Sequence, residues 1–173
     1  MLNNVILVNV DDEAIGVAEK LQAHQQGWLH RAFSVFALRK KESKWQVLLQ
    51  QRHPDKYHCG GLWSNTCCSH PLPNENILTA ATRRLQQEMG FSMPLNMVGK
   101  FMYKVEFENG LIEHEVDHVL FGYIDRDLFT VNDEEVADYA WVELDTLEKD
   151  VLENPKHYTP WLAEALAVLS KCL

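Results

Sequence analysis

The chain has 173 residues, of which 46% are hydrophobic and 24% are charged, a composition typical of one soluble globular domain. Its formal net charge of −9 argues against non-specific binding to nucleic acid or to anionic membranes, because both carry negative charge. The apolar runs fall well short of the roughly 20 residues that a membrane span needs, and the N-terminus lacks the basic segment of a signal peptide.

The first half of the chain predicts three strands and one short helix. VILVNV (5–10) has the composition of a strand, and a helical stretch from Glu13 to about Ala23 is expected to follow it. AFSVFAL (32–38) and WQVLLQQR (45–52) are typical of strands, and the turn KKES joins them. Pro and Gly interrupt the segment 53–73, which predicts a long structured loop. Such loops in compact domains are often functional.

The second half predicts a helix, a hairpin and a final helix. Asn74 is the expected N-cap of a helix that runs to Met89 and ends at Gly90. Further strands are expected at 100–108, 111–124 and 139–144. The dipeptide NG (109–110) joins the first two as a hairpin, and TP (159–160) starts the last helix. Helices that lie between strands predict a mixed α/β layered domain.

The chain contains four cysteines: Cys59, Cys67, Cys68 and Cys172. They form no spaced disulfide framework, and adjacent cysteines such as Cys67 and Cys68 seldom bridge each other. The pattern indicates free thiols in a reduced protein, so we expect a cytoplasmic location.

Five residues could form a metal site. Glu113 and Glu115 stand two apart on a predicted strand, so their carboxylates project to the same side. They could line a solvated face or supply oxygen ligands to a divalent ion. His24, His30 and His70 could complete a mixed nitrogen and oxygen site for zinc, manganese or a similar ion. No standard zinc motif is present, and spacing alone leaves open whether the five converge.

The segment ENILTAATRRLQQEMGF (75–91) resembles the Nudix box, in which glutamates gather the magnesium ions that drive phosphoanhydride hydrolysis. Six residues fall on box positions: Glu75, Arg83, Leu85, Glu88, Gly90 and Phe91. Three residues depart from the box, which has one Gly and two Glu in their place: Ser69, Arg84 and Gln87. Six matches at fixed offsets favour a Nudix fold over an ordinary amphipathic helix. The loss of two glutamates argues against hydrolase chemistry.

From about Val5 to Trp161 the chain resembles the type 1 isopentenyl diphosphate isomerases, which carry a degenerate Nudix box on a Nudix-like fold. The motifs that carry the resemblance are EKLQAH, LHRAFS, LWSNTCCSHP, RRLQQEMG, IEHEV, NDEEVADYAWV and TPW. The resemblance implies an α/β (α+β) protein, a Nudix-like α/β/α sandwich with a mixed β-sheet, formed by residues 1–173 as a single domain. It also implies isomerisation of isopentenyl diphosphate to dimethylallyl diphosphate in isoprenoid biosynthesis.

The same resemblance implies two catalytic groups. In SNTCCSHP the family's catalytic cysteine aligns with Cys68, two residues before His70, and Cys67 then takes a packing position. Moving a double bond needs a proton donor and a proton acceptor on opposite faces of the substrate, and Cys68 with Glu115 matches the family's pair. Tyr103 matches a tyrosine that assists the glutamate.

The resemblance further implies two metal ions and a diphosphate site. One tightly bound Zn²⁺ or Mn²⁺ would be held by His24, His30, His70, Glu113 and Glu115. One Mg²⁺ would bind with the substrate diphosphate at Glu88 and Cys68. The expected diphosphate ligands are Lys20, Arg52, Lys56 and Arg84. Trp161 matches an aromatic residue that can cover a carbocation, although it could equally dock the last helix.

Two other functions are compatible with parts of the sequence. One is a Nudix hydrolase that acts on a nucleoside or prenyl diphosphate, and the other is a non-catalytic zinc-binding or thiol-redox module. The isomerase accounts for more of the motifs. We therefore expect a small-molecule prenyl diphosphate as the partner, with no nucleic acid and no membrane, and a monomer or weak homodimer.

Overall fold

The computed structural model describes residues 3–173. The elements in chain order are β1 (Asn4–Val8), β2 (Ala14–Glu19), α1 (Lys20–Gln26), β3 (His30–Lys41), β4 (Lys44–Arg52), β5 (Trp63–Ser64), β6 (Cys67–Ser69), α2 (Ile77–Met89), β7 (Asn96–Glu106), β8 (Ile112–Tyr123), β9 (Val136–Glu143), α3 (Leu144–Glu153), a short 3₁₀ helix η1 (Pro155–His157) and α4 (Leu162–Ser170).

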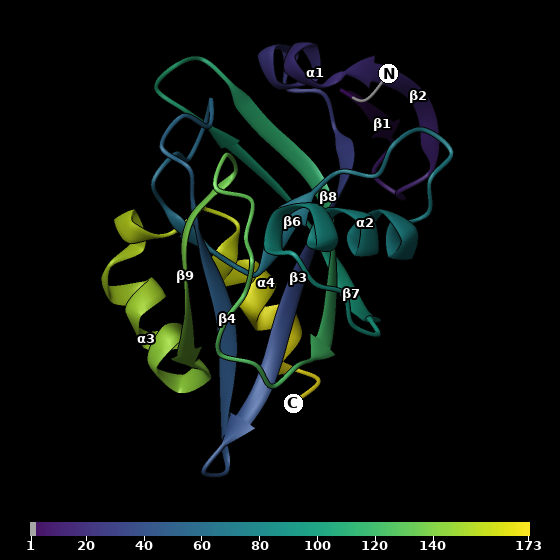
Figure 1. Cartoon of the computed structure of the whole chain (residues 1–173). Helices are drawn as coiled ribbons and strands as arrows, with labels where there is room; N and C mark the ends of the chain where they lie inside the picture. The colour runs from purple at the N-terminus through teal and green to yellow at the C-terminus, as the bar shows by residue number, and fades with distance from the viewer. Residues whose placement is uncertain (1–2) are drawn as a thin grey trace.

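Strand β3 is the centre of one mixed sheet (Figure 1). It pairs antiparallel with β1, β4 and β6, and parallel with β8, in a register that places His30 beside Glu115 and Leu38 beside Tyr123. Strand β7 extends the sheet beyond β8, and β9 and β5 both pair with β4. The parallel pair at the centre needs cover on both faces, because parallel strands are usually buried on both sides.

Two helical layers provide that cover. Because side chains alternate along a strand, Phe33 and Val35 of β3 pack against α2, whereas Phe36 and Leu38 pack against α3 and α4 on the opposite face. Figure 1 shows α2 on one side of the sheet and α3 and α4 on the other. The α/β/α sandwich with a mixed sheet, which the sequence predicts, is therefore confirmed.

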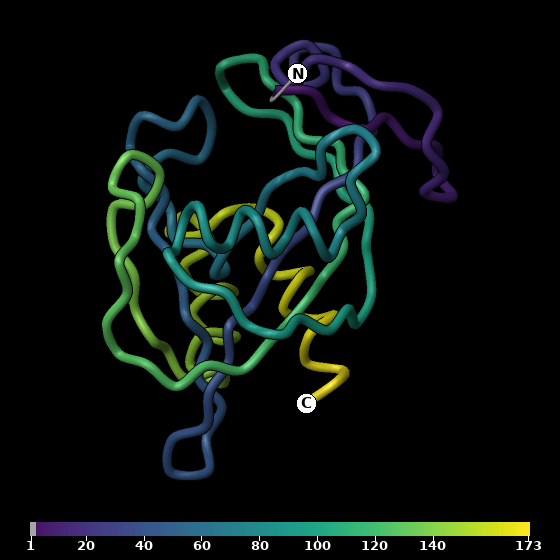
Figure 2. The backbone as a smooth tube through the Cα atoms, turned by 45° about the vertical axis from the view of Figure 1, so that its right-hand side comes forward, coloured from purple at the N-terminus to yellow at the C-terminus, as the bar shows by residue number. Residues whose placement is uncertain are grey.

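The N-terminal segment lies at one end of the sheet. Figure 2 shows the purple β1–β2 hairpin and α1 at the same end of the molecule as the β7–β8 turn. The ring of His114 on β8 hydrogen-bonds the carbonyl of Gly27 at the end of α1, with 3.1 Å between Nδ1 and the oxygen. This arrangement brings a helix from the start of the chain onto the strand that carries the two predicted carboxylate ligands.

Several predicted boundaries are wrong. The expected helix 13–23 is instead strand β2 followed by α1, because β2 pairs with β1 and the Glu19 side chain caps α1 by accepting from the Gln22 amide at 2.9 Å. Helix α2 is capped by Asn76 rather than Asn74, whose φ of 64° places it in a turn. The short strands β5 and β6 inside the predicted loop, and helix α3, were not expected.

The predicted hairpin at 109–110 is confirmed, and its turn runs from Phe107 to Leu111. Gly110 has a φ of 83°, a conformation that glycine adopts readily. Among residues 3–173, no helix has the length and apolar character needed to cross a membrane.

Candidate functional site

The five predicted metal ligands converge. His24 comes from α1, His30 from the start of β3, His70 from the segment after β6, and Glu113 and Glu115 from β8. One nitrogen or oxygen atom from each lies within 4.8 Å of the corresponding atom of every other. Two local features produce this cluster: the alternation of β8, which puts both carboxylates on one face, and the parallel register, which places His30 beside Glu115.

The hydrogen bonds of the cluster suit a bound cation. The Nδ1 atoms of His24 and His30 lie 2.6 and 2.9 Å from the carbonyls of Lys20 and Trp28, so in a neutral imidazole Nδ1 carries the proton and Nε2 has a free lone pair. Both Nε2 atoms face carboxylate oxygens of Glu113 or Glu115. The His24 Nε2 and Glu113 Oε1 atoms are buried and lack a hydrogen-bond donor. Electron pairs that face each other in this way fit a divalent ion between them.

The electrostatics of His70 and Glu115 agree with this geometry. Burial acts to lower the pKa of His30, but the Glu115 carboxylate outweighs it and raises that pKa, so His30 would have to lose its proton to bind a metal. Burial lowers the pKa of His70 to about 4, so its imidazole is neutral near pH 7. Burial and the charge of Glu113 act to raise the pKa of Glu115, but the neighbouring His30 and His70 outweigh them and bring it to about 2. Neutral imidazoles and ionised carboxylates are the forms that bind metals.

The two adjacent cysteines face opposite ways. Strand β6 pairs with β3 so that Cys68 lies beside Ser34 and Cys67 beside Val35. Cys67 is fully buried in the core against α2, whereas Cys68 lines the pocket that also contains Glu115. Burial raises the pKa of the Cys68 thiol to about 12, so the thiol keeps its proton near pH 7.

This pocket has a cavity volume of about 90 Å³ and is lined by both polar and aromatic side chains. Tyr103 donates a hydrogen bond to Glu115. Trp161, which is 3% exposed, donates through Nε1 to Asn65 Oδ1 at 3.3 Å, and its ring centre is 6.2 Å from that of Tyr103. Trp161 therefore lines the pocket and also precedes α4, so both of its expected roles are compatible with its position.

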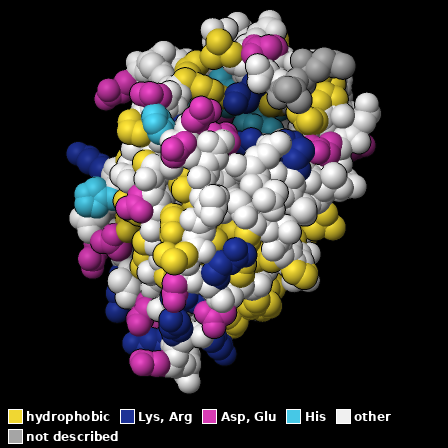
Figure 3. All heavy atoms as spheres, viewed as in Figure 1, with side chains coloured by type: hydrophobic (Ala, Val, Ile, Leu, Met, Phe, Trp, Pro, Cys, Tyr) yellow, Lys and Arg dark blue, Asp and Glu magenta, His cyan; other side chains and the backbone are white. Residues whose placement is uncertain are grey.

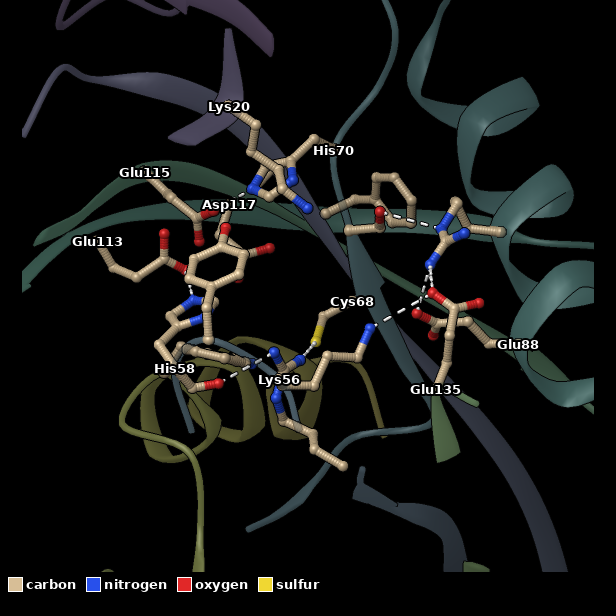
Figure 4. Close-up of a pocket in the computed structure, with 17 residues that line it drawn as sticks. Lys20, Lys56, His58, Cys68, His70, Glu88, Glu113, Glu115, Asp117 and Glu135 are labelled. Atoms are coloured by element: carbon tan, nitrogen blue, oxygen red, sulfur yellow. Dashed lines mark hydrogen bonds and ion pairs between the residues drawn. The ribbon is translucent and has the colours of Figure 1, made fainter. Parts of the chain in front are cut away.

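The four predicted diphosphate ligands lie in the same pocket: Lys20, Arg52, Lys56 and Arg84. Figure 3 shows Lys, Arg and His side chains gathered in a hollow near the N-terminal hairpin. Arg84 donates through Nη2 to Glu88 and to Glu135, both at 2.7 Å. Glu88, 5% exposed, also accepts from Gln50 at 3.1 Å. A cationic patch and a buried carboxylate thus adjoin the thiol (Figure 4).

Comparisons with known proteins place the chain in a family. The profile of the NUDIX domain matches residues 28–162. An isopentenyl-diphosphate Delta-isomerase 2 of Aromatoleum aromaticum is 47% identical over 99% of this chain and 89% of its own length. The isopentenyl-diphosphate Delta-isomerase of Pectobacterium atrosepticum is 46% identical over 92% and 87% of the two chains. This chain belongs to the isopentenyl-diphosphate Delta-isomerase family, within the Nudix superfamily.

Solved structures show the same Nudix fold at low identity. A Deinococcus radiodurans protein has a TM-score of 0.75 at 15% identity, covering 95% of this chain and 97% of its own. A NUDIX hydrolase of Alicyclobacillus acidocaldarius has a TM-score of 0.64 at 10% identity, covering 83% and 92%. The isomerase family therefore shares its fold with hydrolases.

Three further residues of the site are not among those predicted from the sequence: His58, Asp117 and Glu135. His58 places Nε2 at 3.0 Å from Glu113 Oε2, and Glu135 pairs with Lys56 at 3.3 Å as well as with Arg84. Asp117 is buried and accepts from Ser34 at 2.8 Å, and burial together with the charge of Glu115 raises its pKa well above the usual value. The alternation that selected the two glutamates on β8 also selects Asp117. No sequence pattern singles out His58.

Proposed function

We propose that this protein converts isopentenyl diphosphate into dimethylallyl diphosphate, using Cys68 and Glu115 as the proton-transfer pair. The observation that supports this most strongly is the presence of both groups in one pocket, on the strands β6 and β8 that flank β3. In Figure 4 the thiol lies between the glutamates of the histidine cluster and the pair Glu88 and Glu135.

The reaction adds one proton to the terminal alkene carbon and removes one from the carbon two positions away, so the diphosphate stays intact. Protonation creates a tertiary carbocation, and loss of the second proton forms the allylic double bond. The reaction needs one protonated donor and one ionised acceptor. The Cys68 thiol holds its proton near pH 7, and the Glu115 carboxylate is ionised. The reaction is reversible, so each group acts as acid in one direction and as base in the other.

The pocket can protect the cation. The Trp161 ring offers a π face, and Tyr103 orients the Glu115 carboxylate through its hydroxyl. Burial of both aromatic residues, at 3% and 7% exposure, excludes water that would otherwise trap the cation. Tyr103 is therefore proposed as an assisting residue.

Two metal ions would serve this chemistry. His24, His30, His70, Glu113 and Glu115 would hold a tightly bound zinc or manganese, and Glu88 with Cys68 would hold a magnesium that arrives with the diphosphate. These ions supply positive charge, which keeps carboxylates ionised and neutralises phosphate oxygens. Lys20, Arg52, Lys56 and Arg84 would bind the diphosphate itself, and the guanidinium of Arg84 suits its oxygens.

We infer that residues 1–173 act as one domain, as a monomer or weak homodimer in the cytoplasm. The net charge of −9 supports a small-molecule substrate rather than nucleic acid or an anionic membrane. The basic residues that line the pocket concentrate positive charge at the one place where an anionic substrate would need it.

The test is turnover of isopentenyl diphosphate by metal-loaded protein in the presence of magnesium. Dimethylallyl diphosphate and free phosphate are followed together. We expect the allylic product without phosphate release. Release of phosphate would instead indicate a hydrolase, and absence of both products would exclude the proposed reaction.

A further inference from the structure

His58 makes a contact that the expected ligand set does not account for. It lies in the loop between β4 and β5, is 8% exposed, and places Nε2 at 3.0 Å from Oε2 of Glu113. The other oxygen of Glu113, Oε1, faces His24 inside the five-residue cluster. The two oxygens thus have different neighbours, one inside the metal cluster and one outside it.

Aromatic contacts hold the His58 ring in place. Tyr57 stacks on it with 4.6 Å between ring centres and an interplanar angle of 12°. Phe107, from the β7–β8 turn, meets it edge-on at 5.3 Å, and the Trp161 ring centre lies 6.2 Å away. A ring packed on several sides can hold an N–H donor in one direction at little further entropic cost.

The backbone of the same residue touches the expected diphosphate site. The carbonyl of His58 accepts from Arg52 Nη2 at 3.3 Å, and Arg52 is 9% exposed in the same pocket. His58 therefore contacts a metal-cluster residue through its side chain and an anion-binding candidate through its backbone.

Although Nε2 lies 3.0 Å from Glu113 Oε2, neither ring nitrogen of His58 completes a hydrogen bond within the described residues 3–173. We propose that His58 is a positioning residue whose Nε2 hydrogen is donated to Glu113 when the cluster holds a metal, which directs the other carboxylate oxygen at the ion. A neutral or a protonated imidazole can make this donation, so the role does not depend on titration of His58. Hydrogen bonds to ligating carboxylates are typically worth about 10- to 100-fold in metal affinity. The proposal rests on the proposed function only in that the five-residue cluster holds a metal.

The experiment measures zinc and manganese affinity of the full-length, metal-stripped protein by competition with a chelator. His58→Phe keeps the aromatic packing and removes the donor, and we expect it to bind the metal about 10- to 100-fold more weakly. His58→Gln places an amide N–H near the position of Nε2, and we expect it to restore most of the affinity. His53→Ala is the matched control, because His53 lies in the same loop and its ring accepts from the Asp55 amide at 3.0 Å instead.

Thermal unfolding of the metal-free proteins separates this role from a packing role. We expect metal-free His58→Phe to unfold at the same temperature as the wild type, with its deficit confined to metal binding. An affinity within twofold of wild type for His58→Phe would overturn the proposal. So would a His58→Gln protein as weak as His58→Phe, since that result would indicate that the imidazole itself is a ligand.

The two proposals can fail separately. A wild-type protein that binds the metal tightly and shows the expected order of affinities, yet forms no allylic product, would exclude the isomerase reaction and leave the role of His58 intact. Normal turnover with equal metal affinity in all variants would support the isomerase reaction and exclude the role of His58.

Discussion

The opposite orientations of Cys67 and Cys68 lead to a prediction that separates chemistry from packing. Cys68→Ala removes a group that we propose transfers a proton, and Cys67→Ala removes a sulfur from the core. Cys67 is fully buried, and burial together with the charge of Glu88 raises the pKa of its thiol well above the usual value. The two variants differ by one position in the chain, so each is a matched control for the other.

The magnitudes follow from the two environments. General acid–base groups contribute about 10²- to 10⁴-fold, so we expect Cys68→Ala to lower kcat/KM by about 10²- to 10⁴-fold with little change in Tm. Loss of the buried Cys67 sulfur and its packing costs about 1–2 kcal/mol. At roughly 2–4 °C per kcal/mol for a domain of this size, Cys67→Ala should lower Tm by about 2–8 °C while keeping most of the activity.

The assay is formation of dimethylallyl diphosphate, paired with thermal unfolding of the same preparations. An active Cys68→Ala protein beside an inactive, stable Cys67→Ala protein would refute the reasoning, because it would mean that the alternation along β6 is inverted. Loss of activity in both variants without a change in Tm would equally contradict the packing role of Cys67.

Three further predictions test the electrostatics of the site and its surroundings. Because the pKa of Cys68 is raised to about 12, its thiolate fraction at pH 8 is on the order of 10⁻⁴. Iodoacetamide should therefore label the exposed Cys172 first, and it should label Cys68 faster as the pH rises. Equal labelling of both cysteines at pH 8, measured by mass spectrometry, would contradict this. Glu115→Gln should lose both turnover and tight metal, whereas Glu88→Gln should chiefly raise KM for the diphosphate; equal metal content in the Glu115 variant and wild type, by elemental analysis, would count against the five-ligand site. Asp12 loses part of its solvation through burial, but the basic side chains around it outweigh this and lower its pKa, so its stabilising effect is present above pH 3.8 and is lost as pH falls below that value. Asp12→Asn should therefore destabilise the protein by about 1–3 kcal/mol at pH 7 and by progressively less as pH falls below 3.8. A pH-independent effect in chemical unfolding would be evidence against it.

The layers of the fold could be predicted because they depend on local patterns. Apolar runs on β3 and β4 and the Asn-Gly turn specify strands and a hairpin without knowledge of distant contacts. The segment 14–19 was predicted wrongly because its strand depends on pairing with β1, a tertiary contact that a helical interpretation of the same residues ignores. Tertiary pairing overrides weak local preference in such a segment.

In the candidate site, too, local patterns predict some residues, whereas others depend on tertiary contacts. Glu113 and Glu115 were predictable from alternation on one strand, and the same rule would have added Asp117. The convergence of three histidines from separate elements was implied only by the family resemblance, since spacing contains no information on where α1 lies against β8. His58 and Glu135 are not visible in the sequence pattern, because each acts through a partner distant in the chain.

The three departures from the Nudix box are coupled in space. Arg84 donates through Nε to Ser69 Oγ at 3.1 Å and through Nη1 to Gln87 Oε1 at 2.8 Å, so the three substituted positions form one hydrogen-bonded group. The same guanidinium reaches Glu88, the box glutamate that remains. Replacing Arg84 alone by glutamate would bring a carboxylate against Glu88 and Glu135 without a metal-binding partner at position 87. We therefore expect that Arg84→Glu alone would not restore a hydrolase metal site, which is one physical reason why the fold can be shared while the chemistry differs.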